Sequence, residues 1–340
     1  MSKTPAQWTL EKRHLPLKFD WKISRNSTSY KENFFVRFRF NDIEGMGEVA
    51  PNIRYGETPD KIEDDFMIFL SEARKFELGS LIQVHNLLKS LPLCHSLKFG
   101  IESAFTHFLC QVQKKSIHEF FNLPKPTNVY TSFSMPIMEI GGIKDFLEPL
   151  KSYKSLKIKV NQETGKEMLE EIAKYSNQAL RVDANEAWTN VDDLMKFIEA
   201  FPKNNPIDFI EQPMPAHKKD DYKELFKRCP HTLIGDESVE DTADFSELKL
   251  MFHGINMKLM KAGSFLTGIN LLKEAKRNNM KTMIGCMVET SLGIKAAYEI
   301  SSLGDFLDLD GFLLLKNDPF HYLNEKDGLI TLVNEGEAKI

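Results

Sequence analysis

The sequence predicts a (β/α) barrel that follows a smaller α+β part. From residue 129 onward, short apolar runs alternate with helical stretches eight times. The starts of these runs lie 22 to 28 residues apart, which is about the length of one βα unit. Before residue 126 strands come first and helices follow, an order typical of an α+β domain. The 340 residues are enough chain for both parts.

The α+β part is expected over residues 1–125. Residues 34–40 (FFVRFRF) alternate apolar and basic side chains with a period of two, which indicates a strand with one solvated face. A turn at 41–45 and a hairpin partner at 46–50 follow. Helical patterns then cover residues 59–76, 81–91 and 96–113.

The barrel is expected over residues 126–316. Its strands are predicted near residues 129–134, 155–159, 179–183, 207–211, 232–236, 254–260, 281–287 and 305–310. A doubly wound open sheet is the alternative, but that fold normally has a glycine-rich phosphate turn after its first strand, and VYTSFSMPIM has none. Residues 328–333 (GLITLV) indicate a strand that returns to the first part, so 317–340 are assigned to it.

Composition narrows the classes of partner and compartment. With 49 acidic and 44 basic residues the net charge is −5, which argues against nucleic acid or a membrane surface as the main partner. No apolar run approaches the ~20 residues of a membrane span, and residues 1–19 lack a signal-peptide core. The four cysteines form no CxxC pair, which fits a reducing compartment. We expect a soluble cytoplasmic protein, and self-association stays open.

Polar residues fall at the carboxyl ends of the predicted strands, where barrels of this type build their sites. Three of them, Asp183, Glu211 and Asp236, end adjacent strands and follow the apolar runs LRVD, DFIE and LIGD. Such acids also cap helices, but three on consecutive strands favour a shared metal ion. Because the ligands are all oxygen, we expect Mg²⁺ before Mn²⁺ or Ca²⁺.

Lysines flank these acids. Lys157 and Lys159 alternate on the second strand, so both point to the same side. In a strand buried on both sides, two lysines are costly unless they are used. Lys258 ends the sixth strand, four places away in a ring of eight, so Lys159 and Lys258 should face each other across the barrel mouth. This arrangement suits taking a proton from one face of a carbon and returning one to the other.

Asp308 and Asp310 alternate on the eighth strand, opposite the fourth strand and the expected metal. A substrate whose carboxylate binds the metal could extend a cationic group, such as an α-ammonium, toward them. A pair of acids in a surface loop is the alternative. This pattern favours a small molecule that is a carboxylate at one end and an amine at the other.

The chain resembles the enolase superfamily, in the branch that contains muconate lactonizing enzymes and dipeptide epimerases. The shared motifs are GMGEVAP at 45–51, RYGET at 54–58, KIK at 157–159, DAN at 183–185, EQP at 211–213, DES at 236–238 and NMKLMKAG at 256–263. Dipeptide epimerases are similar in GCMVETSLG at 285–293 and DLDGFLLLK at 308–316 as well. The resemblance implies a (β/α)7β-type TIM barrel with an α+β capping domain.

The resemblance also implies roles for single residues. Lys159 and Lys258 would be the two acid/base lysines, and Asp308 and Asp310 would hold the ammonium of a dipeptide. Arg25, in ISRNS at 23–27, falls in the loop where L-Ala-D/L-Glu epimerases carry an arginine for the substrate's side-chain carboxylate. The further substrate contacts expected are Lys157, Ser134 and Glu289.

We therefore expect a Mg²⁺-dependent dipeptide epimerase that inverts the α-carbon of the C-terminal residue, converting L-Ala-D-Glu to L-Ala-L-Glu. The alternatives are an epimerase of other side-chain specificity, an o-succinylbenzoate synthase, a muconate cycloisomerase and an inactive small-molecule binding barrel. Substrates of the synthase and the cycloisomerase have no ammonium to match Asp308 and Asp310, and a binder needs no opposed lysines. Arg181, on the inward face just below Asp183, has no predicted role.

Overall fold

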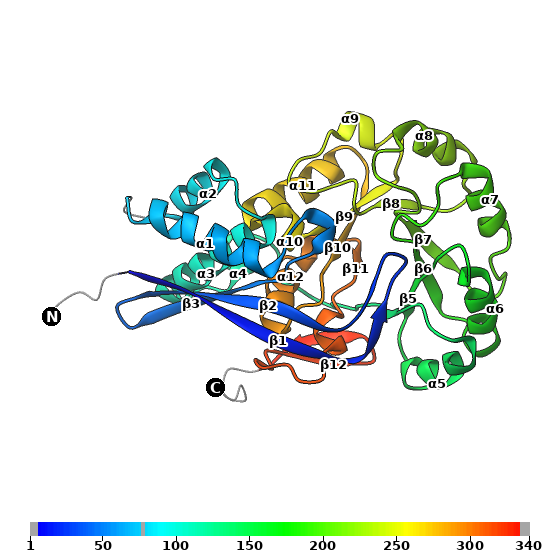
Figure 1. The fold of residues 1–340 in the computed structure, drawn as a ribbon, viewed down its shortest axis with the longest axis horizontal. Helices are drawn as coiled ribbons and strands as arrows, with labels where there is room; N and C mark the ends of the chain where they lie inside the picture. The colour runs from blue at the N-terminus through cyan, green and yellow to red at the C-terminus, as the bar shows by residue number, and fades with distance from the viewer. Residues whose placement is uncertain (1–5, 76–78, 334–340) are drawn as a thin grey trace.

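The structure is a computed structural model that describes residues 6–75 and 79–333. Figure 1 shows an antiparallel sheet with helices on one side of the molecule and a curled parallel sheet with an outer layer of helices on the other. Within the described residues, no helix is both long and apolar enough to cross a membrane.

The first part, called the cap below, is a three-stranded sheet covered by helices. The strands β1 (Gln7–Lys22), β2 (Ser27–Phe40) and β3 (Ile43–Val49) are antiparallel in that order. The main helices are α1 (Pro59–Ala73), α2 (Leu81–Ser90) and α3 (His95–Gln113). Phe34, Val36 and Phe38 share one face of β2 and are buried in the core with these helices. The predicted hairpin and helices are confirmed, except that the helix predicted over 59–76 ends at Ala73, and residue 76 lies outside the described residues.

Two glycines of β3 let the sheet approach α3 closely. A Cβ on Gly45 would lie 2.0 Å from the carbonyl oxygen of Ala104, and one on Gly47 would lie 2.1 Å from that of Gly100. Any larger residue would therefore push α3 away from the sheet. These contacts explain the G-M-G spacing of the motif at 45–47.

Eight parallel barrel strands are present in consecutive order, as predicted, but the first covers only Phe133–Met135 and the last only Phe306–Leu307. Asp308 and Asp310 therefore follow the eighth strand instead of alternating along it, because a 3-10 helix begins at Gly311. The eight strands are β4 (Phe133–Met135), β5 (Ser155–Lys159), β6 (Ala179–Asp183), β7 (Ile207–Glu211), β8 (Leu233–Gly235), β9 (Gly254–Lys258), β10 (Lys281–Gly285) and β11 (Phe306–Leu307). The connecting helices are α5 (Ile143–Leu147), α6 (Gly165–Tyr175), α7 (Val191–Glu199), α8 (Lys219–Arg228), α9 (Phe245–Leu248), α10 (Leu259–Ala262), α11 (Phe265–Arg277) and α12 (Ser291–Glu299). All strands run the same way, so their carboxyl ends meet at one rim.

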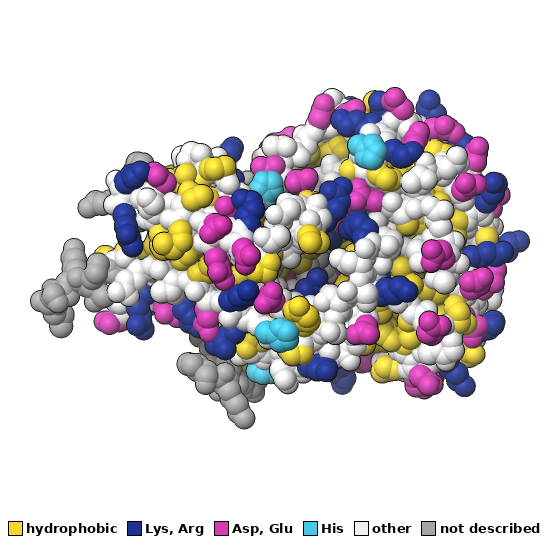
Figure 2. Space-filling view, in the orientation of Figure 1, with side chains coloured by type: hydrophobic (Ala, Val, Ile, Leu, Met, Phe, Trp, Pro, Cys, Tyr) yellow, Lys and Arg dark blue, Asp and Glu magenta, His cyan; other side chains and the backbone are white. Residues whose placement is uncertain are grey.

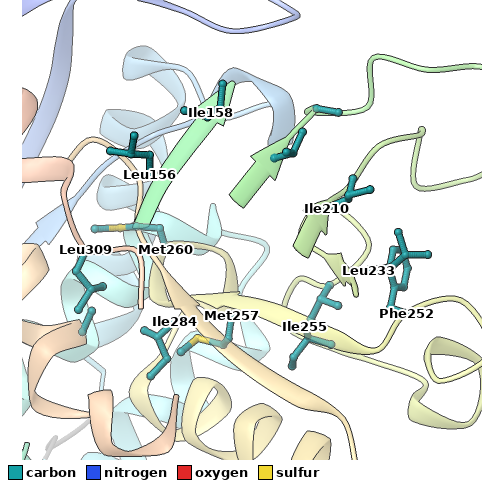
Figure 3. Packing of buried hydrophobic residues seen from close by; sticks show 14 of the residues in the cluster. Leu156, Ile158, Ile210, Leu233, Phe252, Ile255, Met257, Met260, Ile284 and Leu309 are labelled. Carbon is teal, nitrogen blue, oxygen red and sulfur yellow. The ribbon is translucent and has the colours of Figure 1, made fainter. Parts of the chain in front are cut away.

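Alternation along the strands separates the core from the site. Leu156 and Ile158 of β5 belong to the large apolar core, as Figure 3 shows together with Ile210, Ile255 and Met257. Side chains between them point to the opposite face of the sheet. Each buried aliphatic side chain stabilises the fold by roughly 1.5–3 kcal/mol, so the outer layer of the barrel fixes where its inner residues lie.

The tail after the barrel forms a hairpin of β12 (Leu323–Lys326) and β13 (Leu329–Leu332). Leu329 bridges to Tyr130 near the start of the barrel, and the ring of Phe320 lies 4.9 Å from that of Phe35 in the cap. The hairpin confirms a strand at 328–333. The division of the chain at residue 126 and the assignment of the tail to the cap stay predictions, and residues 334–340 lie outside the described residues.

One strand was missed by the sequence reading. β1 is 16 residues long, and β2 begins seven residues before the predicted start at 34. Trp8 and Leu10 alternate with polar residues in one phase, and Leu15, Leu17, Phe19 and Trp21 alternate in the other, with the charged segment 11–14 between them. Because the phase changes within this half-exposed strand, no single regular alternation marks its 16 residues.

Candidate active site

A cavity opens at the carboxyl ends of the barrel strands, between the barrel and the cap. It encloses about 860 Å³ including its open mouth. Figure 2 shows Lys and Arg side chains gathered where the cap meets the barrel. The predicted residues that line the cavity are Arg25, Ser134, Lys157, Lys159, Asp236, Lys258, Asp308 and Asp310. The structure thus brings most of the predicted site together.

The three predicted metal ligands are fully buried at the ends of β6, β7 and β8. Lys157 Nζ lies 3.0 Å from Asp183 Oδ2 and 2.9 Å from Glu211 Oε2. Asp236 pairs with two other lysines. In the described part of the chain, no three His, Cys, Asp or Glu side chains form a ready-made cage for an ion. Ammonium groups lie among the carboxylates instead.

The donor set nevertheless fits a divalent cation. Glu211 Oε2 is buried and accepts no well-directed hydrogen bond from a described residue. Burial and the negative charge of Asp183 raise the pKa of Glu211 to about 7. Asn256 Nδ2 donates to Glu211 Oε1 at 2.8 Å and fixes the direction of the carboxylate. Clustered carboxylate oxygens are the ligands that a hard cation such as Mg²⁺ prefers.

The two predicted acid/base lysines lie on either side of these carboxylates. In the sheet order, β5 with Lys159 and β9 with Lys258 flank β6, β7 and β8. Lys159 Nζ donates to Asp183 Oδ2 at 2.6 Å, and Lys258 Nζ donates to Asp236 Oδ2 at 2.7 Å. Burial lowers the pKa of Lys258, but the carboxylates of Asp236 and Glu211 outweigh it and raise that pKa.

Lys157 is buried between the metal-ligand group and the eighth strand. Its Nζ contacts Asp308 Oδ2 at 2.8 Å as well as Asp183 and Glu211. Burial disfavours its charge, yet Asp308 and Glu211 prevail and hold the pKa of Lys157 well above its usual value. Lys157 is therefore a fixed cation in the wall of the cavity.

Lys261 is a member of the site that the sequence reading left out. Its Nζ donates to Asp236 Oδ1 at 2.6 Å and to the carbonyl of Asn256 at 3.1 Å. It follows Lys258 by three residues, and α10 begins between them at Leu259. Positions three apart share a helix face, so the spacing K-L-M-K was a usable signal once the helix start was known.

Asp308 and Asp310 line the cavity, but Asp308 does not lie opposite the metal ligands as predicted, because Lys157 Nζ joins it to Asp183 and Glu211. Asp308 accepts from Ser132 Oγ at 2.8 Å, and Asp310 accepts from the backbone N–H of Ser134 at 2.6 Å. Burial raises the pKa of Asp308, but Lys157 outweighs it and lowers that pKa. Burial and the neighbouring Asp308 raise the pKa of Asp310 to about 7.

Glu289 is placed behind the wall rather than in the cavity. It is buried, its Oε1 accepts from the N–H of Met287 at 2.8 Å, and it is not among the lining residues. Burial and the adjacent Glu48 raise the pKa of Glu289 to about 8. Its role as a substrate contact stays a prediction.

Arg25 reaches the cavity from the cap, but its charge is already compensated. Its Nη1 lies 3.0 Å from Glu186 Oε2, and its Nη2 lies 2.9 Å from Glu237 Oε1. Arg54, from the next cap loop, binds Glu186 with two hydrogen bonds of 2.8 and 2.9 Å. Asn185 and Glu186 have left-handed φ angles of 44° and 67°. This unusual turn holds Glu186 where both cap loops meet the barrel.

Comparisons with known proteins agree with this geometry. The family described as enolase C-terminal domain-like matches residues 143–307. An L-Ala-D/L-amino acid epimerase of Pedosphaera parvula is 32% identical over 95% of both chains. An L-Ala-D/L-Glu epimerase of Bacteroides thetaiotaomicron is 28% identical over 98% of this chain and 85% of its own.

A solved structure has the same fold. The dipeptide epimerase from Enterococcus faecalis, complexed with Mg and L-Leu-L-Tyr, matches with a TM-score of 0.86 and 22% identity over 98% of both chains. The match confirms the predicted enolase-type barrel with an α+β part before it.

Proposed function

The chain belongs to the dipeptide epimerase branch of the enolase superfamily, and on that premise we propose that it is a Mg²⁺-dependent dipeptide epimerase. It inverts the α-carbon of the C-terminal residue by moving protons between two lysines. The observation that carries the proposal is the placement of Lys159 and Lys258 on β5 and β9, with three buried carboxylates on the strands between them.

The metal site in this proposal consists of Asp183, Glu211 and Asp236. When bound, Mg²⁺ would offset the negative charge that grows on the substrate carboxylate as the α-proton leaves. Lys157 adds a fixed positive charge beside the same carboxylates. The chain thus supplies a cationic end of the cavity for the carboxylate of the residue that is inverted.

Proton transfer falls to the lysines. One lysine takes the α-proton from its face of the carbon, and the other returns a proton to the opposite face. The roles exchange when the reaction runs the other way, because each epimer presents its α-hydrogen to a different lysine. Both side chains are 8% exposed, so the reaction is screened from bulk water.

Asp308 and Asp310 orient the substrate through its amino group. Their carboxylates line the cavity beside Lys157, which joins Asp308 to the metal-ligand group, and they match the α-ammonium of a dipeptide. A dehydration or cycloisomerisation substrate carries no ammonium, so it would leave Asp310 without a cationic partner among the described residues. The names of the relatives support L-alanine as first residue and include glutamate as second, so we propose L-Ala-D/L-Glu among the substrates.

The experiment is proton NMR of the purified protein with Mg²⁺ and L-Ala-D-Glu in D₂O. We expect the glutamate α-proton signal to disappear as L-Ala-L-Glu appears, and Lys159→Ala and Lys258→Ala to abolish the epimerisation. Absence of exchange with this dipeptide and with a library of others would refute the proposal. Normal turnover by either lysine variant would refute the two-lysine mechanism.

We further propose that the enzyme works in a reducing compartment, the cytoplasm. The cysteines at 94, 110, 229 and 286 are all free, and two of them are buried. Self-association and the lack of nucleic-acid or membrane partners stay predictions.

A further inference from the structure

The barrel has a junction that no strand ladder joins in the described residues. The sheet ends at β4 on one side and β11 on the other. Hydrogen bonds from backbone N–H groups to side-chain oxygens connect the two ends instead. The N–H of Leu309 donates to Thr131 Oγ1 at 2.8 Å, and the N–H of Ser134 donates to Asp310 at 2.6 Å. The residues that complete the barrel thus adjoin the pair Asp308 and Asp310.

Arg181 extends from β6 across the inside of the barrel to this junction. It is 7% exposed, and its guanidinium lies 5.6 Å from the ring of Phe209 and 5.4 Å from that of Phe306. Nε donates to Asp208 Oδ2 at 3.2 Å, and Nη1 donates to the carbonyl of Leu307 at 2.5 Å. Since Leu307 directly precedes Asp308, Arg181 fixes the backbone that carries this carboxylate.

Ser132 connects Arg181 to Asp308 a second time. Arg181 Nη1 donates to Ser132 Oγ at 3.2 Å, and Ser132 Oγ donates to Asp308 Oδ1 at 2.8 Å. A guanidinium has only donors and a hydroxyl has one proton, so the arginine directs that proton toward Asp308. The other oxygen of Asp308 accepts from Lys157 at 2.8 Å. Both oxygens are thereby fixed before any substrate arrives.

We propose that Arg181 and Ser132 are positioning residues for the ammonium subsite. They hold the carboxylate of Asp308 in the orientation that receives the amino group of the first residue. This inference rests on the proposed function, since it takes Asp308 and Asp310 as the ammonium site. Neither residue needs to touch the substrate, and neither takes part in the proton transfer.

The expected effect is confined to substrates that carry the ammonium. A hydrogen bond to a charged group contributes enough for about a tenfold change in affinity. Ser132→Ala should therefore raise KM for a dipeptide about tenfold and leave kcat within about twofold. Arg181→Lys keeps the buried charge but loses the forked geometry, and it should shift KM in the same direction.

The test compares the dipeptide that turns over fastest with its desamino analogue, in which propionyl replaces L-alanine. KM is measured for the dipeptide, and the inhibition constant is measured for the analogue. We expect Ser132→Ala to weaken the dipeptide about tenfold and the analogue less than twofold. The matched control is Thr282→Ala, which removes hydrogen bonds from the buried Thr282 Oγ1 to Leu303 and Asp305 and takes no part in the contacts that hold Asp308 and Asp310. This control variant should have a lower Tm but the same ratio of the dipeptide KM to the inhibition constant of the analogue.

Three results would overturn the inference while the proposed function stands. The Ser132→Ala variant could weaken the dipeptide and the analogue equally, Thr282→Ala could change the ratio as much as Ser132→Ala, or the wild type could bind the analogue as well as the dipeptide. Absence of turnover with every dipeptide would instead refute the proposed function itself. If Ser132→Ala fails to fold, the dipeptide KM and the inhibition constant of the analogue are measured for Arg181→Lys instead, and the same ratio tests the inference.

Discussion

Glu186 determines what the guanidinium of Arg25 can offer a substrate. Because Glu186 and Glu237 both pair with Arg25, the positive charge that a substrate carboxylate would need is largely compensated. In the predicted subsite for the second residue, Arg25 should therefore give less preference for an acidic side chain than a free arginine would.

Removing the charge of Glu186 should increase the preference of this subsite for an acidic side chain. We expect Glu186→Gln to raise the ratio of kcat/KM for L-Ala-L-Glu over L-Ala-L-Gln about tenfold, because one carboxylate fewer competes for Arg25. Steady-state epimerisation with the two dipeptides measures the ratio. Glu240→Gln is the control, since Glu240 follows the same strand as Glu237 but does not line the cavity. An unchanged ratio in Glu186→Gln would contradict the role given to this ion pair.

A single-lysine variant separates the two proton transfers. We expect Lys258→Met to lower epimerisation by about 10²–10⁴-fold, the usual contribution of a positioned acid or base. The remaining Lys159 should still exchange the α-proton of one epimer with solvent, and the other epimer should not exchange. Proton NMR in D₂O, started from each epimer, measures both rates, with the exposed Lys249→Met as control. Loss of exchange from both epimers alike would argue against separate roles.

The residues at the strand ends could be predicted from sequence, whereas the contacts of the cap could not. Asp183, Glu211 and Asp236 follow apolar runs at a regular spacing, so the parallel strands alone bring them to one rim. Arg25 and Glu186 are 161 residues apart and meet only because two loops fold over the barrel. No local pattern encodes such a contact, and the strained turn at Asn185 leaves no periodic signal.

At the scale of elements, α3 and α12 connect the cap to the barrel through buried polar groups. Glu48 of β3 accepts from the N–H groups of Thr290 and Gly293, at the start of α12, both at 3.0 Å. A carboxylate at a helix N-terminus satisfies N–H groups that the helix itself leaves free. On α3, His107 Nε2 is buried without a hydrogen-bond partner among the described residues.

The burial of His107 predicts a loss of stability in acid. Burial and the positive charge of Lys295 on α12 lower the pKa of His107 to about 4, from 6.5. The unfolded chain therefore binds a proton that the folded chain excludes, so this group costs stability as the pH falls from about 6.5 to 4. The loss should be of order 3 kcal/mol.

Urea unfolding at pH 7 and pH 5 measures this effect. We expect His107→Gln to lose less stability than the wild type between the two pH values. The exposed His217→Gln should behave like the wild type. Equal pH dependence in His107→Gln and the wild type would show that the buried imidazole is not responsible.

The barrel strands were predictable and β1 was not, for the same physical reason. Strands β5 to β10 lie inside a layered fold and carry apolar runs that stand out from the helices between them. β1 is an edge strand of the cap sheet with much of its surface exposed, and its apolar alternation changes phase across the charged residues 11–14, so no single regular pattern marks it.

The whole molecule is a closed arrangement of cap and barrel around a charged cavity. Carboxylates and ammonium groups form ion pairs inside the cavity. This pairing offsets the free-energy cost of burying each charge, even without a bound ion. Asp236 shows this compensation, since burial raises its pKa while Lys258 and Lys261 hold it well below the usual value. The parallel strands bring Asp183, Glu211 and Asp236 together only in the folded chain, so a cation held by all three binds only that state.

Mg²⁺ should stabilise the fold accordingly. At a concentration of 100 times its Kd, a ligand of the native state adds about 2.7 kcal/mol, so we expect Tm to rise on adding Mg²⁺ and to fall back with EDTA. Differential scanning calorimetry measures the shift. Asp236→Asn should lose the shift, and the exposed Glu163→Gln should keep it. A shift of full size in Asp236→Asn would place the ion elsewhere.

The central claim is that Lys159 and Lys258 act on opposite faces of one carbon. Its most direct test is the isotope content of the first product formed in D₂O, measured by mass spectrometry and proton NMR before the reaction reaches equilibrium. Two separate lysines predict that each new epimer carries deuterium at the α-carbon while the remaining substrate still carries hydrogen. A product that keeps the hydrogen of its substrate would mean that one group serves both faces, and the account would be wrong.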